Sequence, residues 1–186
     1  MISTIIKTFK ISAVICLTGC ASLITNPTTY VLSGDITGQS FEDFKQYISK
    51  HNVNEVILDS NGGDLIEAIK IGEVIHNRGI DTTVPKGVLC ASACGYIFLS
   101  GDIKTLRGSI GMHEVSFRGR GYNTLTLEEK EEILVTTLVV SNYLGYIGVS
   151  LQFFLDNLNT YIPDLQIVES PEELNQYIVR GNLVVK

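Results

Sequence analysis

Two residues of this chain have the types and the local settings that nucleophilic catalysis requires. Ser92 lies in the run CASAC at positions 90–94, between a predicted strand and an almost wholly apolar segment. A serine at a strand-to-helix junction exposes its hydroxyl, and the amide of the following residue, Ala93, is placed to stabilise an oxyanion. His113 follows the glycine-rich run GSIGM and has the chemistry of a general base. Taken alone, Ser92 is better explained by close packing or helix capping, and His113 by a satisfied hydrogen bond near the surface.

A glycine pair provides a third chemical feature. Positions 59–64 read DSNGGD, at the end of a predicted strand and directly before a predicted helix. Glycines allow backbone dihedral angles that leave N–H groups facing a ligand, and the start of a helix adds positive potential. The turn at Gly62 and Gly63 therefore has the means to hold an oxyanion, although most such turns only reverse or redirect the chain.

Cysteines flank the candidate nucleophile on both sides. Cys90 and Cys94 are four positions apart, and a disulfide between them requires Cα atoms within about 7 Å of each other. A local disulfide that fixes the turn and a pair of buried free thiols are both compatible with the sequence. We find no Cys-x-x-Cys pair and no histidine cluster, so we expect neither a metal site nor an organic cofactor.

The N-terminus has the order of a secretory signal. Residues 1–10 carry two lysines and no acid, an apolar run follows, and Leu17-Thr-Gly-Cys20 resembles the bacterial lipobox, which implies cleavage before Cys20 and acylation of its thiol. We therefore expect a signal peptide at 1–19, a lipidated tether at 20–28 and one domain at 29–186. No aspartate follows Cys20, which favours the outer membrane, so we expect a periplasm-facing lipoprotein of the bacterial envelope.

Charge excludes one class of partner. The net charge is −6, and loss of residues 1–19 leaves 12 basic and 20 acidic residues, a net charge of −8. A protein that binds nucleic acid needs a basic face to neutralise phosphates, so we expect no nucleic-acid partner.

Hydrophobic periodicity predicts an α/β domain. With 45% hydrophobic and 18% charged residues, the chain can bury a sizeable core. Strand and helix patterns alternate along it, which is typical of α/β folds. The expected strands are 30–32, 56–58, 80–84 and 88–89, and the expected helices are 41–50, 64–78 and 92–99.

An uncharged segment follows in the second half of the chain. Positions 133–155 hold 23 residues without charge, which is long enough to span a membrane. However, six of these residues are polar and two are glycines, and Thr126 with Glu129 forms a capping box that marks a helix beginning in water. We predict one long helix here, buried in the domain or at a subunit interface, and its apolar surface leads us to expect a homo-oligomer.

Together, the three chemical features resemble the Clp protease proteolytic subunit and its superfamily. The pair Gly62-Gly63 precedes Ser92 by 30 and 29 positions, His113 follows Ser92 by 21, and ESPEEL at 169–174 resembles the final helix motif of that family. CASAC and the run Ile110-Gly-Met-His are most similar to exported bacterial ClpP-like proteins. The resemblance implies the ClpP/crotonase spiral of repeated strand-strand-helix units.

The resemblance also assigns roles. It implies that Ser92 is the nucleophile and His113 the base, and that the amides of Gly63 and Ala93 form the oxyanion hole. The orienting acid would be Asp164, and Asp156 is the alternative.

The function implied is an envelope-anchored serine peptidase, or peptidase-like hydrolase, that acts on a peptide or protein substrate. One alternative is a catalytically inactive ClpP-like scaffold that binds envelope proteins or peptides. A crotonase-type acyl-CoA enzyme fits poorly with export. A Ser-Lys dyad would need Lys86 or Lys104 as its base.

Overall fold

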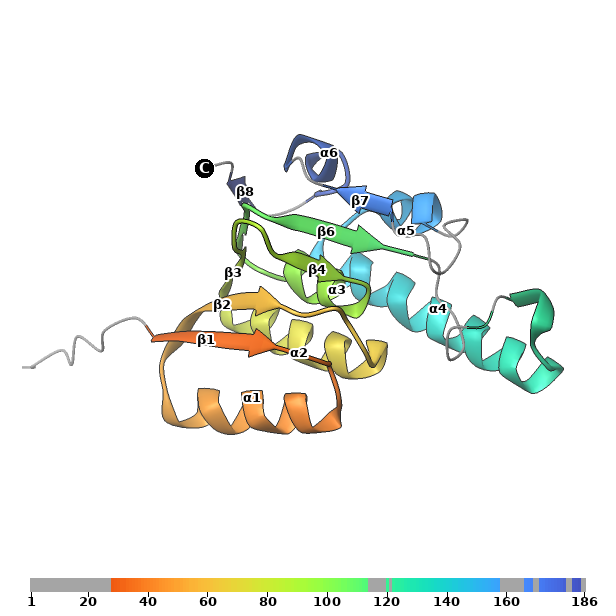
Figure 1. Cartoon of the computed structure of the whole chain (residues 1–186), viewed down its shortest axis with the longest axis horizontal. Helices are drawn as coiled ribbons and strands as arrows, with labels where there is room; N and C mark the ends of the chain where they lie inside the picture. The colour runs from red at the N-terminus through yellow and green to blue at the C-terminus, as the bar shows by residue number, and fades with distance from the viewer. Residues whose placement is uncertain are drawn as a thin grey trace, which may run out of the picture.

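Strands and helices alternate along the chain, as the hydrophobic pattern predicts (Figure 1). The computed structural model describes residues 28–113, 120, 122–157, 166–168, 171–179 and 182–184. The strands are β1 (Thr28–Ser33), β2 (Val53–Asp59), β3 (Asp81–Val84), β4 (Leu89–Ala91), β5 (Ile103–Leu106), β6 (Ser109–Met112), β7 (Gln166–Val168) and β8 (Asn182–Val184). The helices are α1 (Gly38–Lys50), α2 (Leu65–Arg78), α3 (Ala93–Leu99), α4 (Leu127–Ile147), α5 (Leu151–Asn157) and α6 (Pro171–Asn175), with a 3-10 turn at Tyr122–Thr124.

The strands form two sheets. The larger sheet has the order β1-β2-β3-β5-β8 and contains only parallel pairs, and the smaller has the order β4-β6-β7. In the smaller sheet β4 and β6 are parallel, whereas β7 is antiparallel to β6. The units β3-β4-α3 and β5-β6-α4 each send their first strand to the large sheet and their second to the small one. This arrangement confirms the predicted α/β fold of strand-strand-helix units.

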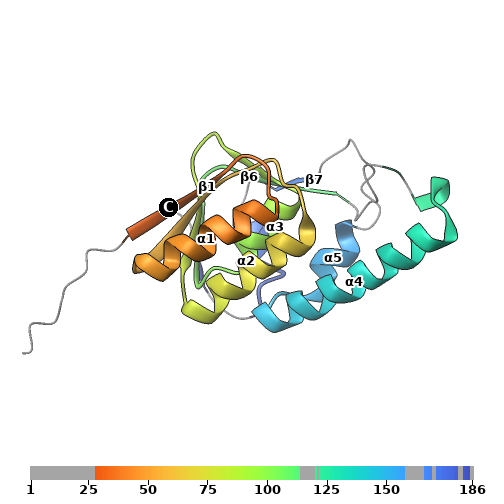
Figure 2. The same ribbon diagram turned by 90° about the horizontal axis from the view of Figure 1, so that it is seen from below.

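Local sequence signals define the ends of the first helices. Thr37 begins α1 with a capping box, and the Asp64 side chain accepts a hydrogen bond from an amide in the first turn of α2. Gly79 ends α2 in the left-handed conformation, at a φ of 61°. The two helices lie side by side in Figure 2. All seven residues of α3 are buried, so this helix lies in the centre of the core.

The predicted long helix is in fact two helices. The capping box of Thr126 and Glu129 is present, and α4 begins directly after Thr126. The helix ends at Ile147 because Gly148 adopts a left-handed conformation with a φ of 77°, and α5 begins three residues later. No described helix is both long enough and apolar enough to cross a membrane.

Most of α4 extends away from the rest of the molecule (Figures 1 and 2). Its buried residues all lie in its last eight positions, and no residue of the stretch 126–139 is buried. Only the C-terminal part of α4 therefore packs on the core.

Candidate active site

Ser92 has a strained backbone. It connects β4 to α3 with a φ of 54° and a ψ of −122°, and among the described residues it is the only non-glycine residue with a positive φ. Such a conformation costs roughly 1–3 kcal/mol and persists only where the surrounding structure enforces it. It is the conformation expected of a nucleophile on a sharp turn between a strand and a helix.

Hydrogen bonds hold both peptide groups of Ser92. Its N–H donates to the Gly111 carbonyl oxygen at 2.6 Å, and its own carbonyl oxygen accepts from the Gly95 amide at 3.0 Å. The Ser92 hydroxyl does not cap α3, and the residue is half-buried. The strained turn is thus held through the backbone, while the hydroxyl is left out of the helix cap.

Gly62 lies directly against this turn. A Cβ atom at Gly62 would be 2.7 Å from the Ala91 carbonyl oxygen and 2.8 Å from the Ser92 Cβ. Gly62 also has a φ of 101°, which side chains rarely tolerate. Both observations explain why glycine stands here, and they place the glycine turn in contact with the candidate nucleophile.

Gly63 is held by the backbone of Ile36. The Ile36 N–H donates to the Gly62 carbonyl oxygen at 2.9 Å, and the Asp64 N–H donates to the Ile36 carbonyl oxygen at 2.8 Å. These two bonds form a parallel bridge, in which the N–H and the carbonyl group of Gly63 itself point away from Ile36. No backbone acceptor among the described residues takes a hydrogen bond from the amides of Gly63 or Ala93. Both amides therefore have the donor capacity that an oxyanion hole needs.

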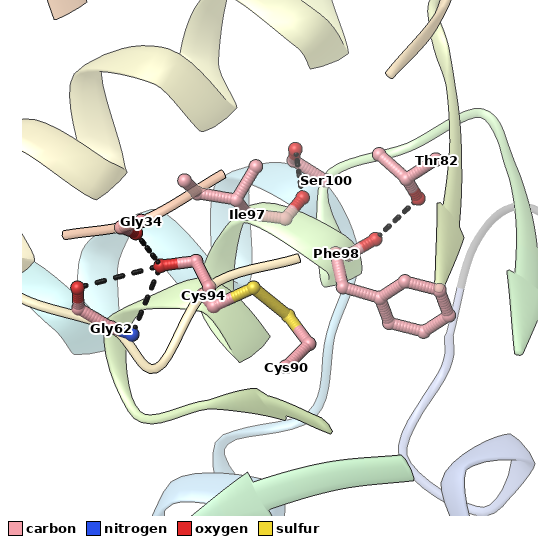
Figure 3. Close-up of a disulfide and its surroundings, with 9 residues drawn as sticks. Gly34, Gly62, Thr82, Cys90, Cys94, Ile97, Phe98 and Ser100 are labelled. Carbon is pink, nitrogen blue, oxygen red and sulfur yellow. Dashed lines mark hydrogen bonds between the residues drawn. A yellow bond between two sulfur atoms is a disulfide. The ribbon is translucent and has the colours of Figure 1, made fainter. Parts of the chain in front are cut away.

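Ser60 is a contributor that the sequence analysis missed. It is buried, and its Oγ accepts the Gly62 N–H at 3.0 Å and donates to the Gly34 carbonyl oxygen at 2.6 Å. The hydrogen bonds to Gly34 and Gly62 are drawn in Figure 3. A serine that bonds the amide two residues later is a known turn former, so its position before Asn-Gly was the available signal.

His113 directly follows β6, and Ser92 directly follows the neighbouring strand β4. β4 and β6 are parallel, with Ala91 paired to Gly111, so Ser92 and His113 both follow the carboxyl ends of neighbouring strands. Neighbouring strands lie about 4.8 Å apart. His113 is half-buried. The fold therefore brings these two predicted residues to the same edge of the small sheet.

Two acidic residues, Asp164 and Asp156, are the candidates for the third member of the site. Asp164 lies outside the described residues, as does Cys20, the residue expected to be lipidated. Asp156, the alternative acid, is exposed on α5 and accepts hydrogen bonds from the Tyr177 hydroxyl at 2.7 Å and from the Gln152 side-chain amide at 2.6 Å. The bond with Tyr177, and after it the bond with Gln152, lowers the pKa of the Asp156 carboxyl, and the bond with Asp156 raises the pKa of Tyr177 to about 12. The hydrogen bonds of Asp156 thus hold it to α5 and the C-terminal segment.

The lysines considered for a Ser-Lys dyad lie elsewhere. Lys86 is exposed in the turn before β4, at the opposite end of that strand from Ser92. Lys104 is buried in β5 of the large sheet, where its Nζ donates to the Gly101 carbonyl oxygen at 2.6 Å and burial lowers its pKa. Neither position favours a role as base for Ser92.

The two cysteines beside Ser92 are joined. A disulfide links Cys90 in β4 to Cys94 in α3, with Cα atoms 5.3 Å apart, and both residues are fully buried (Figure 3). Of the described histidines, cysteines and acids, no three gather in a group that could hold a metal ion.

Comparison with known proteins relates this chain to others through its fold. No protein-family model and no curated protein matches it. Among solved structures, a serine-to-alanine mutant of the 1510-N membrane-bound stomatin-specific protease is 24% identical, with a TM-score of 0.56 over 85% of this chain and 80% of that one. A lysine-to-alanine mutant of the same protease in complex with a substrate peptide is 22% identical, with a TM-score of 0.55 over 85% and 75% of the two chains.

A third similar structure is the ClpP protease catalytic domain from Plasmodium falciparum, at 18% identity, with a TM-score of 0.58 over 85% of each chain. The fold of this protein is therefore the α/β fold of the ClpP-like proteases. At these identities the likeness concerns the fold alone.

Proposed function

We propose that this protein is a serine peptidase or peptidase-like hydrolase, in which Ser92 is the nucleophile and His113 the general base. One observation carries the proposal: Ser92 has a strained backbone at a strand-to-helix turn, in contact with the glycine turn and beside β6, the strand that His113 follows. Strain of this kind is found where function requires it.

The proposed reaction follows from the positions of these groups. Ser92 Oγ attacks the substrate carbonyl while His113 takes its proton, and the amides of Gly63 and Ala93 stabilise the negative charge on the carbonyl oxygen. The proton then passes from His113 to the leaving amine, and water releases the acyl group by the same route. We assign the orientation of His113 to Asp164 from sequence position alone.

The proposed substrate is a peptide or a protein. A protease of the same fold has been captured with a substrate peptide, which supports this choice. We further propose that the chain is anchored through a lipid on Cys20 to the outer membrane of the bacterial envelope, facing the periplasm. An oxidising compartment agrees with the disulfide beside the site.

A fluorophosphonate probe that labels active serines tests the catalytic proposal. We expect the wild-type protein to be labelled, and both Ser92→Ala and His113→Ala to lose at least about 100-fold in labelling rate, because nucleophile and base act as a unit. Ser49→Ala and His51→Ala, both exposed and remote in chain position from the site, are the matched controls and should label like the wild type.

Thermal melting would show that all four variants fold. Undiminished labelling of either site variant would contradict the assignment of that residue. If the folded wild-type protein takes up no probe, the inactive scaffold is the better description.

A further inference from the structure

We propose that the Cys90–Cys94 disulfide is a positioning element of the candidate site, which holds Ser92 and the Ala93 amide in their active geometry and makes that geometry dependent on oxidation. This inference rests on the proposed role of Ser92 as the nucleophile. It assigns the regulation of that site to the disulfide between the two cysteines that flank Ser92 in the sequence.

The disulfide closes a five-residue loop around the nucleophile. Cys90 is fixed in β4, where it pairs with Ile110 of β6, and Cys94 is fixed in the first turn of the buried helix α3. The only residues between the two anchors are Ala91, Ser92 and Ala93. Closing the loop therefore restricts the strained residue and the amide that follows it, and hardly any other part of the chain.

The disulfide acts together with the backbone hydrogen bonds and the glycine contact that hold the positive φ of Ser92. The described backbone bonds of this residue are the two to Gly111 and Gly95, and Gly62 contacts the turn from one side. A strained conformation relaxes when its surroundings no longer over-determine it. We expect reduction to let the turn adopt ordinary backbone angles, which would move the Ser92 hydroxyl and turn the Ala93 amide.

The rest of α3 is held independently of the disulfide. At the other end of the helix, the Thr82 hydroxyl donates to the Phe98 carbonyl oxygen at 2.8 Å and the Ser100 hydroxyl donates to that of Ile97 at 2.6 Å (Figure 3). All seven helix residues are buried in the core. Opening the disulfide should therefore loosen Ser92 and Ala93 while the fold remains.

The chemistry of the change is simple. A dithiol reductant transfers two electrons and two protons, so that the disulfide becomes two thiols and the dithiol is oxidised to its own disulfide. Because both cysteines are fully buried, reduction requires a local opening and should be slow.

The first test measures the rate of fluorophosphonate labelling in the full-length protein. Wild type is compared in its oxidised form, after reduction and removal of dithiothreitol, and after reoxidation, together with the double variant Cys90→Ala/Cys94→Ala. We expect at least about a tenfold slower rate in the reduced protein and in the double variant, with recovery on reoxidation in the wild type only. Ile75→Val, which removes one buried methyl group from the second half of α2, controls for a general loss of stability and should label normally.

The second test does not depend on activity. Hydrogen–deuterium exchange, read by mass spectrometry on peptides covering 89–99, compares the oxidised and reduced wild-type proteins. We expect faster exchange on reduction in these peptides and unchanged exchange in α1. Equal exchange in both states, or a reduced folded protein that labels within twofold of the oxidised one, would overturn the positioning role.

The two tests also separate the two proposals. If oxidised wild-type protein takes up no probe, the catalytic assignment fails, and the exchange measurement alone decides whether the disulfide orders the turn.

Discussion

At the scale of single residues, the candidate site depends on contacts that only glycine permits. Gly62 touches the backbone on both sides of Ser92, with the Ala91 carbonyl oxygen and the Ala93 nitrogen 2.7 and 3.1 Å from where its Cβ would lie. These contacts are with backbone atoms, which cannot rotate away as the end of a side chain can. A methyl group at this position would have to displace the nucleophile turn itself.

We therefore predict that Gly62→Ala lowers the fluorophosphonate labelling rate by about 100-fold and the free energy of unfolding by about 2–4 kcal/mol, through steric overlap and backbone strain together. Gly87→Ala is the matched control, because Gly87 also has a positive φ, of 78°, but nothing lies within 4 Å of its Cβ position. It should lose stability through strain alone and label normally once folded. Equal labelling by the two alanine variants would show that the contact with the turn is unimportant.

The sequence indicates candidate residues only where the proposed chemistry depends on a side chain or on glycine. Ser92, His113 and the glycine pair belong to this class, and the fold brings them together. Ile36 could not be predicted in the same way, because it holds the glycine turn only through its backbone N–H and carbonyl groups. Almost any residue type could make those two bonds, so the sequence carries no mark of the role.

At the scale of elements, α4 is the segment where sequence pattern and structure differ most. Absence of charge predicts burial or an interface but does not fix where a helix ends. Gly148 ends the helix, because its left-handed conformation lets the last carbonyl groups of α4 accept hydrogen bonds from the amides that follow. The projecting part of α4 also retains exposed apolar side chains at Leu134, Val135 and Leu138, which are 61%, 60% and 57% exposed.

We propose that this apolar part of α4 packs against a second copy of the chain in an antiparallel pair. The first turns of α4 carry four glutamates and one lysine, whereas its C-terminal half is uncharged. Antiparallel pairing lays each acidic end against an uncharged segment, while parallel pairing would place eight glutamates together. A projecting helix gains most of its stability from such packing.

We predict that analytical ultracentrifugation at micromolar concentration finds wild type larger than a monomer, and that Leu134→Glu/Leu138→Glu shifts it to the monomer. The two glutamates would be buried without partners in the interface. Val31→Glu on β1, where valine is 56% exposed, is the control and should assemble normally. A monomeric wild type, or a double variant that assembles unchanged, would exclude this interface.

At the scale of the whole molecule, the alternation of strands and helices as far as α3 followed from hydrophobic periodicity, whereas β5 and the pairing of distant strands did not. β8 joins the large sheet beside β5, about eighty positions earlier in the chain, and β7 runs antiparallel to β6. Both late strands are only three residues long, which is too short for a period to be recognised. The positions of β7 and β8 in the two sheets depend on packing against the core that the preceding strand-strand-helix units form.

The proposed membrane anchor is also a property of the whole chain, because it would decide where the domain acts. We predict that metabolic labelling with an alkyne palmitate analogue modifies the wild-type protein in a bacterial host and that Cys20→Ala abolishes the modification. Cys16→Ala, four positions earlier in the segment expected to be removed, should leave it intact. Continued palmitate incorporation by Cys20→Ala would rule out the proposed lipid attachment.

The bridge between Ile36 and Gly63 constrains how the protein can vary in evolution. The stretch 34–37 connects a strand to a helix, a kind of connection that commonly accepts insertions and deletions among related proteins. Here its backbone sets the direction of the Gly63 amide, which the proposed chemistry uses. A change of one residue in the length of this connection would shift Ile36 out of register with the glycine turn. We therefore expect this connection to keep a constant length among active relatives even where its residue types differ.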